Sequence, residues 1–315
     1  NLMKFIKNFI LILLFILPIS NSFGAMVTFV DSFQVSNGTS AGTDRAGLDN
    51  NTDKEIGGVQ FNDDGTKMFV RFFRDMDGGA DPDTELYSYI DQYNLSTPFD
   101  ASTGTYAVSC ELNHGSVATT GHQPFDLNFS SDGMKFYVAN RSTASSNSDK
   151  NFVYRFDLTA PYDISDCSYA QRTENLGNFI NGSQAGDSAS SLGHTNNRLQ
   201  GVSLSNDGKK MFTLMVYGHV LEYDLSTAFD VTTFSLNLNG GMDLSSDTNN
   251  PQSIEFSEDG TRIFIANHNN HKILQVSLNA PFDTSSYTVD GAVAFNISSL
   301  GGVNQMRTVT FSKNG

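Results

Sequence analysis

The sequence has no tryptophan, only two cysteines and few basic side chains in its 315 residues. Its 19 Lys and Arg stand against 34 Asp and Glu, which gives a formal net charge of -15 at pH 7. Because no basic stripe is present to neutralise phosphates, we expect no nucleic-acid partner. Cations are the natural counter-species of such a surface.

Common catalytic signatures are also missing. The sequence contains no HExxH, GxSxG or Cys-x-x-Cys motif and no phosphate-binding loop, so no recognised nucleophile, redox or nucleotide site stands out. Nothing after residue 24 sustains the apolar stripe of an amphipathic helix. An all-β fold class is therefore expected.

The first 24 residues have the three parts of a secretory signal peptide. Lys4 and Lys7 precede an apolar run at residues 9–17, and small residues follow at positions 20, 22 and 24. A transmembrane anchor is the alternative, although anchors usually carry about 20 apolar residues. We expect a mature domain at residues 25–315 that is secreted, periplasmic or on the cell surface, without membrane insertion after the signal is removed.

One pattern occurs four times and begins a fifth: an apolar alternation ending in Phe or Leu, an Asp-Gly or Asn-Gly turn, and a second apolar run. A second phrase, Leu-x-x-x-Phe/Tyr-Asp, follows in phase at residues 95–100, 158–163, 225–230 and 278–283. We expect its aromatic residue to be buried at the turn between the third and fourth strands and its Asp to cap that turn. Each unit contains four short segments with strand-like alternation. The Asp-Gly pairs are expected to close hairpins, which makes these aspartates structural. The alternations end at Phe61, Phe129, Leu204, Phe256 and Phe311.

Two segments carry a resemblance to a known family. Residues 135–140 (Lys-Phe-Tyr-Val-Ala-Asn) and 262–267 (Arg-Ile-Phe-Ile-Ala-Asn) each follow an Asp-Gly pair. They resemble the YVTN-type repeats of bacterial β-propeller proteins, including lactonase-like propellers, over about residues 55–315. The first and third units depart from the pattern where Ala-Asn would stand, and the absence of Trp argues against WD40 and quinoprotein propellers. The resemblance implies a β-propeller of four-stranded antiparallel blades.

The repeat period also suits one blade per unit. We expect an incomplete ring of four full blades and a partial terminal blade from Arg307, with a domain truncated at its C-terminus. Residues 26–35 are expected to supply a closing strand to that last blade. A β-sandwich or a β-solenoid is the alternative. The full blades are expected to begin near Ile56, Pro124, Leu199 and Pro251.

The two cysteines would meet an oxidising compartment after export. Cys110 lies ten residues after Asp100, whereas Cys167 lies four after Asp163, and these two aspartates are equivalent in the repeat. The offset places the cysteines toward opposite ends of equivalent strands, and a disulfide requires Cα atoms within about 7 Å. The sequence leaves both a disulfide and two free thiols open.

The long insertions all fall on one side of the predicted ring, which we call the insertion side. Binding loops often concentrate in this way, and neutral drift in loop length is the alternative. On the same side, polar residues begin each innermost strand. Their side chains suit a polar or anionic small ligand, or they satisfy strand ends and water without one. These candidate ligand-binding residues are His122, Gln123, Arg198, Gln200, Asn249, Asn250, Gln252 and Arg307.

An acidic loop follows the second predicted strand. Such a density of oxygen atoms can bind Ca²⁺. The loop is not an EF-hand, because Ala80 stands where Gly is needed and Leu86 where Glu is needed. A solvated acidic hairpin is the alternative, and no other cofactor is expected. The candidate metal ligands are Asp75, Asp77, Asp81, Asp83 and Glu85.

The predicted function is that of an exported binding module without chemistry of its own. It would recognise an extracellular glycan, polymer or protein through the loops of the insertion side. The alternative is a periplasmic lactonase-like or other hydrolase with a divalent cation in the channel, which needs acidic or His ligands at the axis. A structural repeat module of a larger surface protein is a third hypothesis.

Overall fold

The computed structural model describes residues 54–75, 86–112, 122–142, 151–176, 198–248, 250–269, 271–294 and 306–311. The expected signal peptide, the expected closing strand at residues 26–35 and most of the insertions lie outside these ranges. No helix within the described ranges is long and apolar enough to cross a membrane.

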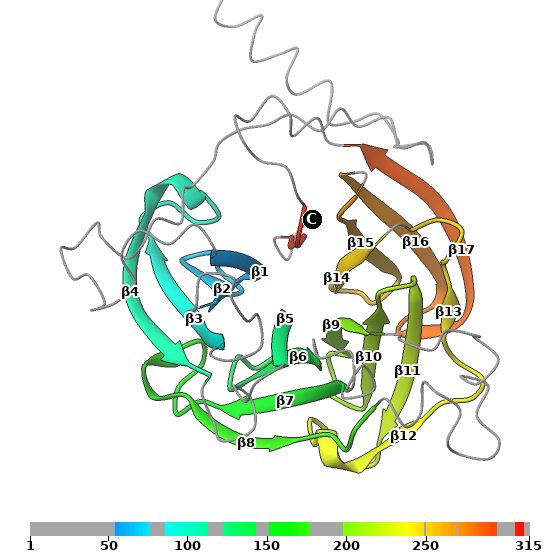
Figure 1. Cartoon of the computed structure of the whole chain (residues 1–315), viewed down its shortest axis with the longest axis horizontal. Coiled ribbons are helices and arrows are strands. Elements are labelled where there is room, and N and C mark those ends of the chain that lie inside the picture. Colours follow the sequence, from blue (N-terminus) through cyan, green and yellow to red (C-terminus); the bar gives the residue numbers. More distant parts are fainter. Residues whose placement is uncertain are drawn as a thin grey trace, which may run out of the picture.

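The described chain forms four antiparallel sheets, arranged one after another about a common centre (Figure 1). Each sheet begins at the centre and adds its strands outward in chain order, so the predicted four-stranded blades are confirmed. Their innermost strands begin within two residues of the predicted positions. The strands are β1 (Lys54–Phe61), β2 (Lys67–Asp75), β3 (Leu86–Leu95) and β4 (Gly104–Glu111) in the first blade; β5 (His122–Phe129), β6 (Lys135–Ser142), β7 (Asn151–Asp157) and β8 (Ser168–Arg172) in the second; β9 (Leu199–Leu204), β10 (Lys210–Met215), β11 (His219–Leu225), β12 (Phe234–Leu236) and β13 (Met242–Asp243) in the third; and β14 (Pro251–Phe256), β15 (Arg262–Asn267), β16 (Lys272–Ala280) and β17 (Asp283–Ala294) in the fourth.

The third blade has a divided outer strand. β12 pairs with the C-terminal half of β11, and β13 pairs with its N-terminal end. Residues 306–311 carry no assigned strand, but they lie between β1 and β14 in Figure 1 and bond to the fourth blade. The Val309 N–H donates to Ser253 Oγ at 3.1 Å. The partial terminal blade therefore stays a prediction.

The Asp-Gly pairs form the hairpin turns between the first two strands of each blade, as predicted. In the second blade, Asp132 Oδ1 accepts the Met134 N–H at 2.9 Å and the Ser130 hydroxyl at 2.6 Å. Gly133 follows with a φ of 67°, which an L side chain rarely adopts. The same bonding recurs at Asp64, Asp207 and Asp259. These aspartates are therefore turn-forming residues.

The Leu-x-x-x-Phe/Tyr-Asp phrases form the turns between the third and fourth strands. Each Asp accepts a backbone N–H two residues on, for example Asp230 Oδ1 from Thr232 at 3.0 Å. In the first three blades this Asp caps a short 3₁₀ turn, and in the fourth Asp283 begins β17. The capping turns described as 3₁₀ are η2 (Ala101–Thr103), η3 (Ile164–Asp166) and η5 (Val231–Thr233). The capping part of the prediction is confirmed.

The aromatic residue of the phrase was expected to be buried, and this expectation is wrong in degree. Phe229 is half-buried, and Phe99 is 36% exposed. The ring lies against the glycine of the Asp-Gly turn, where any Cβ would overlap it. The Phe229 N–H also donates to the Gly208 carbonyl at 2.7 Å. The aromatic residue thus joins the two turns on one side of the ring, which we call the turn side.

Side chains of one blade bond to the aromatic residue's carbonyl in the next blade. Lys67 Nζ donates to the Tyr162 carbonyl at 2.7 Å, and Lys210 Nζ donates to the Phe282 carbonyl at 2.9 Å. Between the second and third blades, Tyr137 and Arg155 share this role toward Phe229 at 3.1 Å each. The turn side is therefore tied together from blade to blade.

Apolar cores fill the spaces between adjacent blades. Phe69 and Ile90 of the first blade pack with Leu127, Phe136 and Tyr154 of the second, and all five are fully or almost fully buried. Similar clusters join the second to the third blade and the third to the fourth. Burying one such side chain contributes about 1.5 to 3 kcal/mol. The blades therefore depend on their neighbours for stability.

Cys110 and Cys167 form a disulfide, with their Cα atoms 6.1 Å apart. In the sequence, the two cysteines occupy different positions within equivalent repeat units, which left their pairing undecided. In the structure the two residues belong to different blades, and the end of β4 passes the η3 turn that precedes β8. The offset therefore brings the cysteines together and links the first two blades covalently.

Candidate functional site in the centre of the ring

The innermost strand of every blade contains a β-bulge at the same point. The pairing with the second strand shifts between Ile56 and Val59 in β1 and between Pro124 and Leu127 in β5. Corresponding shifts occur in β9 and β14, at Gln200 and Gln252. A bulge inserts an extra residue and re-aims nearby side chains. The four bulges therefore surround the centre of the ring with re-aimed side chains and backbone groups.

The Asp126 carboxylate, at the bulge of β5, is bonded by three inner strands. It accepts the N–H of Leu127 at 3.0 Å, of Val202 at 3.3 Å and of Ile254 at 3.4 Å. These donors belong to the second, third and fourth blades. An inner strand has backbone N–H groups on its free edge that no neighbouring strand pairs with. The Asp126 carboxylate accepts hydrogen bonds from these N–H groups.

Small residues at equivalent positions make room for this carboxylate. A Cβ on Gly201 would lie 3.0 Å from Asp126 Oδ2, and one on Gly58 would overlap Leu127. On the other side, the fully buried Arg71 donates from Nη1 to the Phe125 carbonyl at 3.3 Å. Its guanidinium occupies the space where a Cβ on Gly57 would stand. Gly58 and Gly201 therefore allow the inner strands to approach closely, and Gly57 leaves space for the buried Arg71.

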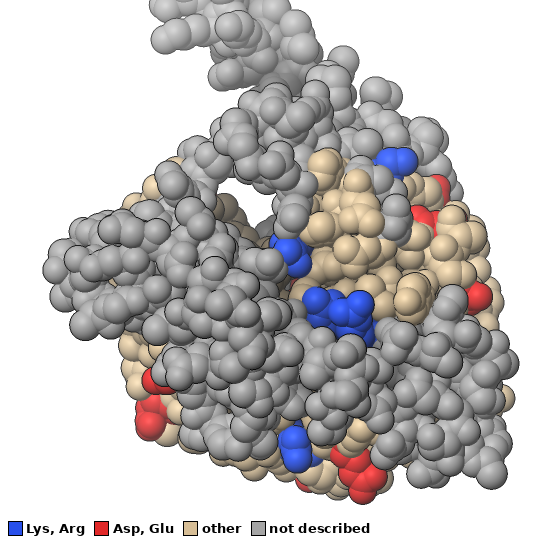
Figure 2. All heavy atoms as spheres, viewed as in Figure 1, with Lys and Arg blue, Asp and Glu red and all other residues tan. Residues whose placement is uncertain are grey.

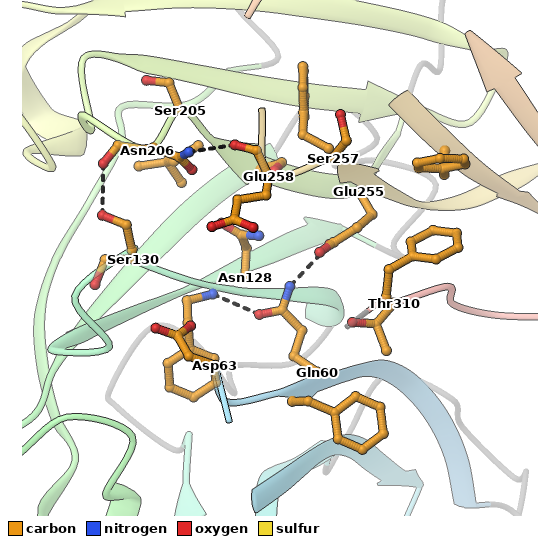
Figure 3. Close-up of a pocket in the computed structure, with 18 of the residues that line it drawn as sticks. Gln60, Asp63, Asn128, Ser130, Ser205, Asn206, Glu255, Ser257, Glu258 and Thr310 are labelled. Atoms are coloured by element: carbon orange, nitrogen blue, oxygen red, sulfur yellow. Dashed lines mark hydrogen bonds between the residues drawn. The ribbon is translucent and has the colours of Figure 1, made fainter. Parts of the chain in front are cut away.

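The Glu255 carboxylate lies next to this centre and is partly exposed. Gln60 Nε2 donates to Glu255 Oε2 at 3.2 Å, while Gln60 Oε1 accepts the Phe129 N–H at 2.9 Å (Figure 3). Burial, followed by the charge of Asp126, raises the pKa of Glu255 to about 8. Burial likewise raises the pKa of Asp126 to about 8, although the three N–H donors and Arg71 oppose the shift. The pair therefore holds fewer than two negative charges at neutral pH.

A cavity of about 630 Å³ opens above Glu255 on the turn side. We call it the turn-side cavity. Equivalent inner-strand positions of all four blades, Gln60, Asn128, Ser203 and Glu255, line it together with Thr310. The Asp-Gly turns surround it and bond to one another: the Ser131 hydroxyl donates to the Asn206 carbonyl, and the Asn206 amide donates to the Glu258 carbonyl, each at 2.7 Å. A cavity lined by converging polar groups is the default place to look for a ligand.

The structure brings part of the predicted insertion-side site together. Arg307 Nη1 donates to Gln252 Oε1 at 3.2 Å, and Gln252 Nε2 donates to Asn250 Oδ1 at 2.8 Å. Arg198 is half-buried, and no bond to this group is found within the described ranges. Gln200 is fully buried, and neither atom of its amide has a partner among the described residues. The site as a whole stays a prediction.

Other predicted site residues lie wholly or partly outside the described residues. The β5 backbone includes His122 and Gln123, but their side chains are not described, and Asn249 is outside. Of the acidic loop, Asp75 belongs to the end of β2 and the rest is outside. Among the residues described, no group of three or more His, Cys, Asp and Glu side chains could hold a metal ion. The Ca²⁺ prediction is therefore untested.

Sequence reasoning missed the central residues Gln60, Arg71, Asp126 and Glu255. One signal was available for Asp126, because the equivalent residues three positions before the recurring Phe or Leu are Gly58, Gly201 and Ser253. A carboxylate in a column of small residues is a departure that alignment of the repeats exposes. Figure 2 shows described basic side chains both near the centre of the face in view and toward its edge, whereas the described acidic ones lie toward its edge.

The arrangement of the sheets defines the chain as a β-propeller protein. No family model matches the sequence, and no curated protein matches it. The YVTN-type resemblance therefore stays a prediction.

Solved structures of similar shape include the periplasmic gluconolactonase PpgL of Pseudomonas aeruginosa, with a TM-score of 0.40 and 15% identity over 76% of this chain and 54% of that one. A protein from Lactobacillus plantarum gives a TM-score of 0.42 and 12% identity over 76% and 72% of the two chains. The Cps50 (Swd1) β-propeller domain of Myceliophteria thermophila gives 0.38 and 10% over 79% and 76%. This chain thus spans little more than half the length of PpgL, and similarities of this size carry no conclusion on activity.

Proposed function

We propose that the protein is an exported binding module that recognises an extracellular glycan, polymer or protein without catalysing a reaction. The observation that carries this proposal is the turn-side cavity, where amide, hydroxyl and carboxylate groups from four blades face one space. Such groups hydrogen-bond polar ligands. An arrangement that brings polar groups from four blades to one space suits recognition.

The insertion side is the second surface that this proposal assigns to binding. The bonded group of Asn250, Gln252 and Arg307 supports a polar or anionic contact there. The two surfaces are separable by mutation, because Asn128 lines the turn-side cavity while Arg198 flanks β9 on the insertion side.

A screen of glycans, polymers and small metabolites by thermal shift, followed by calorimetry, tests the proposal. We expect a hit to lose affinity at least tenfold in Asn128→Ala if it binds the cavity, or in Arg198→Ala if it binds the insertion side. Asp224→Asn is the control, because Asp224 is exposed on β11 and lines no part of the cavity. If no compound binds, or if both variants retain every affinity, the proposal is wrong.

Glu255 favours a hydrolase as the second candidate. A carboxyl whose pKa is raised to about 8 and that borders a cavity is suited to general acid–base chemistry. Lactone and ester hydrolysis followed by pH-stat titration tests this candidate. Turnover that disappears in Glu255→Gln while Asp224→Asn keeps it would replace the binding-module proposal; no turnover in the parent protein would exclude the hydrolase for those substrates.

A further inference from the structure

Aromatic side chains form much of the wall of the turn-side cavity. They are held in pairs: the ring centroids of Phe129 and Tyr162 lie 5.3 Å apart, and those of Phe264 and Phe311 lie 4.3 Å apart. Pairing fixes the rings before any ligand arrives, which lowers the cost of ordering them on binding. The aromatic lining consists of Phe61, Phe129, Tyr162, Phe256, Phe264, Phe282 and Phe311.

The charged lining of the same cavity is mostly acidic. Asp63, Glu255, Glu258 and Asp259 line it, against the single cation Arg262. Hydrogen bonds from Ser257 and Thr261 lower the pKa of Asp259, and the charge of nearby Arg262 adds a smaller contribution. The remaining carboxylates therefore give the cavity a negative potential.

Nearby lysines do not compensate for this charge. Lys67 Nζ is bonded to the Tyr162 carbonyl, and Lys210 Nζ is bonded to the Phe282 carbonyl and to Glu222 Oε1. Both lysines are used to join blades, and neither lines the cavity. At the floor, the Glu255 carboxylate accepts a hydrogen bond from the neutral amide of Gln60. Among the described residues, no Lys or Arg side chain bonds to the Glu255 carboxylate. This carboxylate is therefore available to a cation that enters the cavity.

Aromatic rings and carboxylates around one cavity match one ligand chemistry. The faces of aromatic rings attract cations, and this attraction strengthens when water is excluded. A methylated ammonium group has a large, weakly hydrated surface that can contact the aromatic rings. Its positive charge can pair with the Glu255 carboxylate at the floor of the cavity. An anionic ligand would be repelled by the carboxylates, and a neutral polyol would leave the excess charge uncompensated.

We propose that the turn-side cavity binds a small organic cation through a methylated or quaternary ammonium group. This inference rests on the proposed binding function and names the ligand chemistry of one of its two surfaces. The ammonium group would lie among the aromatic rings above Glu255. A cavity of about 630 Å³ is large enough to take such a group with the molecule that carries it.

Choline and its uncharged isostere 3,3-dimethylbutan-1-ol are the matched probes, because they differ in charge at nearly constant shape. Calorimetry on the full chain, at pH 9 where Glu255 is ionised and with a chelator present, should show choline binding at least tenfold more tightly than the alcohol. Glu255→Gln should reduce choline affinity about tenfold and leave the alcohol unchanged, and Asp224→Asn should alter neither. Glu258→Gln provides a second cavity variant if Glu255→Gln does not fold.

The possible outcomes separate this inference from the proposed function. Equal affinity for choline and the alcohol, or no binding of either, overturns ammonium recognition, while glycan or metabolite hits in the broader screen would leave the binding-module proposal standing. If Ca²⁺ raises the melting temperature through Glu255 and choline does not, the cavity is a metal site and the inference is wrong. Tight choline binding that is lost in Glu255→Gln supports both.

Discussion

Replacing Glu255 with Gln should make the folded protein more stable above neutral pH. The carboxyl has a pKa of about 8 in the folded state against an ordinary value of 4.5, first because of burial and second because of Asp126. A carboxyl with a raised pKa contributes stability that is present below the unfolded pKa and lost as the pH rises through the folded pKa. For Glu255 that loss runs from about pH 4.5 to about pH 8. Glutamine keeps an oxygen and carries no charge.

The size of the effect follows from the shift. Each pKa unit corresponds to about 1.4 kcal/mol, so a shift of this size would amount to ~5 kcal/mol. Because the carboxylate borders the cavity and its water, we expect about half, or ~2 kcal/mol between pH 5 and pH 9. Asp126 titrates in the same window, and Arg71 and the three N–H donors oppose its shift, so the parent protein should lose at least this much.

Urea unfolding from pH 5 to pH 9 measures the effect directly. The free energy of unfolding of the parent protein should fall across this range, and that of Glu255→Gln should fall less, so that the variant becomes the more stable protein by pH 9. The turn aspartates do not interfere, because hydrogen bonds from Ser257 and Thr261 lower the pKa of Asp259 to about 2 and its contribution is lost only in acid. Parallel curves for the two proteins would refute the assignment of a buried, charge-repelled carboxyl.

Removing the disulfide by Cys110→Ser with Cys167→Ser should lower the free energy of unfolding by about 4 kcal/mol, because the bridge closes a loop of 57 residues; chemical denaturation measures it, and an unchanged midpoint contradicts the expectation. Phe229→Ala should cost about 2 kcal/mol, less than a full core deletion because the ring is half-buried; a loss above about 3 kcal/mol in the same assay would show that it acts as a core residue. Gln200→Leu should stabilise the fold by about 1 to 3 kcal/mol, since it removes a buried amide without a described partner; destabilisation would indicate a bound water or ligand at the amide. Ca²⁺ should raise the melting temperature if residues 75–85 bind it, and an unchanged melt in excess Ca²⁺ would end that prediction.

The fold was predictable because each repeat encodes its own blade. The strands of a blade pair with their sequence neighbours, so alternation, Asp-Gly turns and spacing contain the information needed. Turn chemistry is equally local: Asp230 bonds to Thr232, two residues away. Such contacts repeat with the sequence, and the repeats therefore predict both turns of the blade.

Contacts between blades were predicted less well. The burial of Phe229 was overestimated because a recurring aromatic residue suggests a core position, whereas this ring lies against the turn glycine Gly208. The sequence left the pairing of Cys110 and Cys167 undecided, because their positions within the repeat do not show how neighbouring blades approach each other. The outer strand of one blade meets a turn of the next, and sequence spacing within a unit does not report that approach.

The structure at the centre of the ring depends on contacts between residues of different blades. The Asp126 carboxylate reaches the Val202 N–H across 76 residues and the Ile254 N–H across 128. Its position requires a bulge in β5 and small residues at equivalent points of the other inner strands, and neither requirement is visible in one copy of the repeat. Sequence reasoning found the polar ends of the inner strands because they recur in every unit. It missed the central carboxylates because a ring of similar blades needs such a group only once, so the residue that matters most at the axis is the one that breaks the repeat.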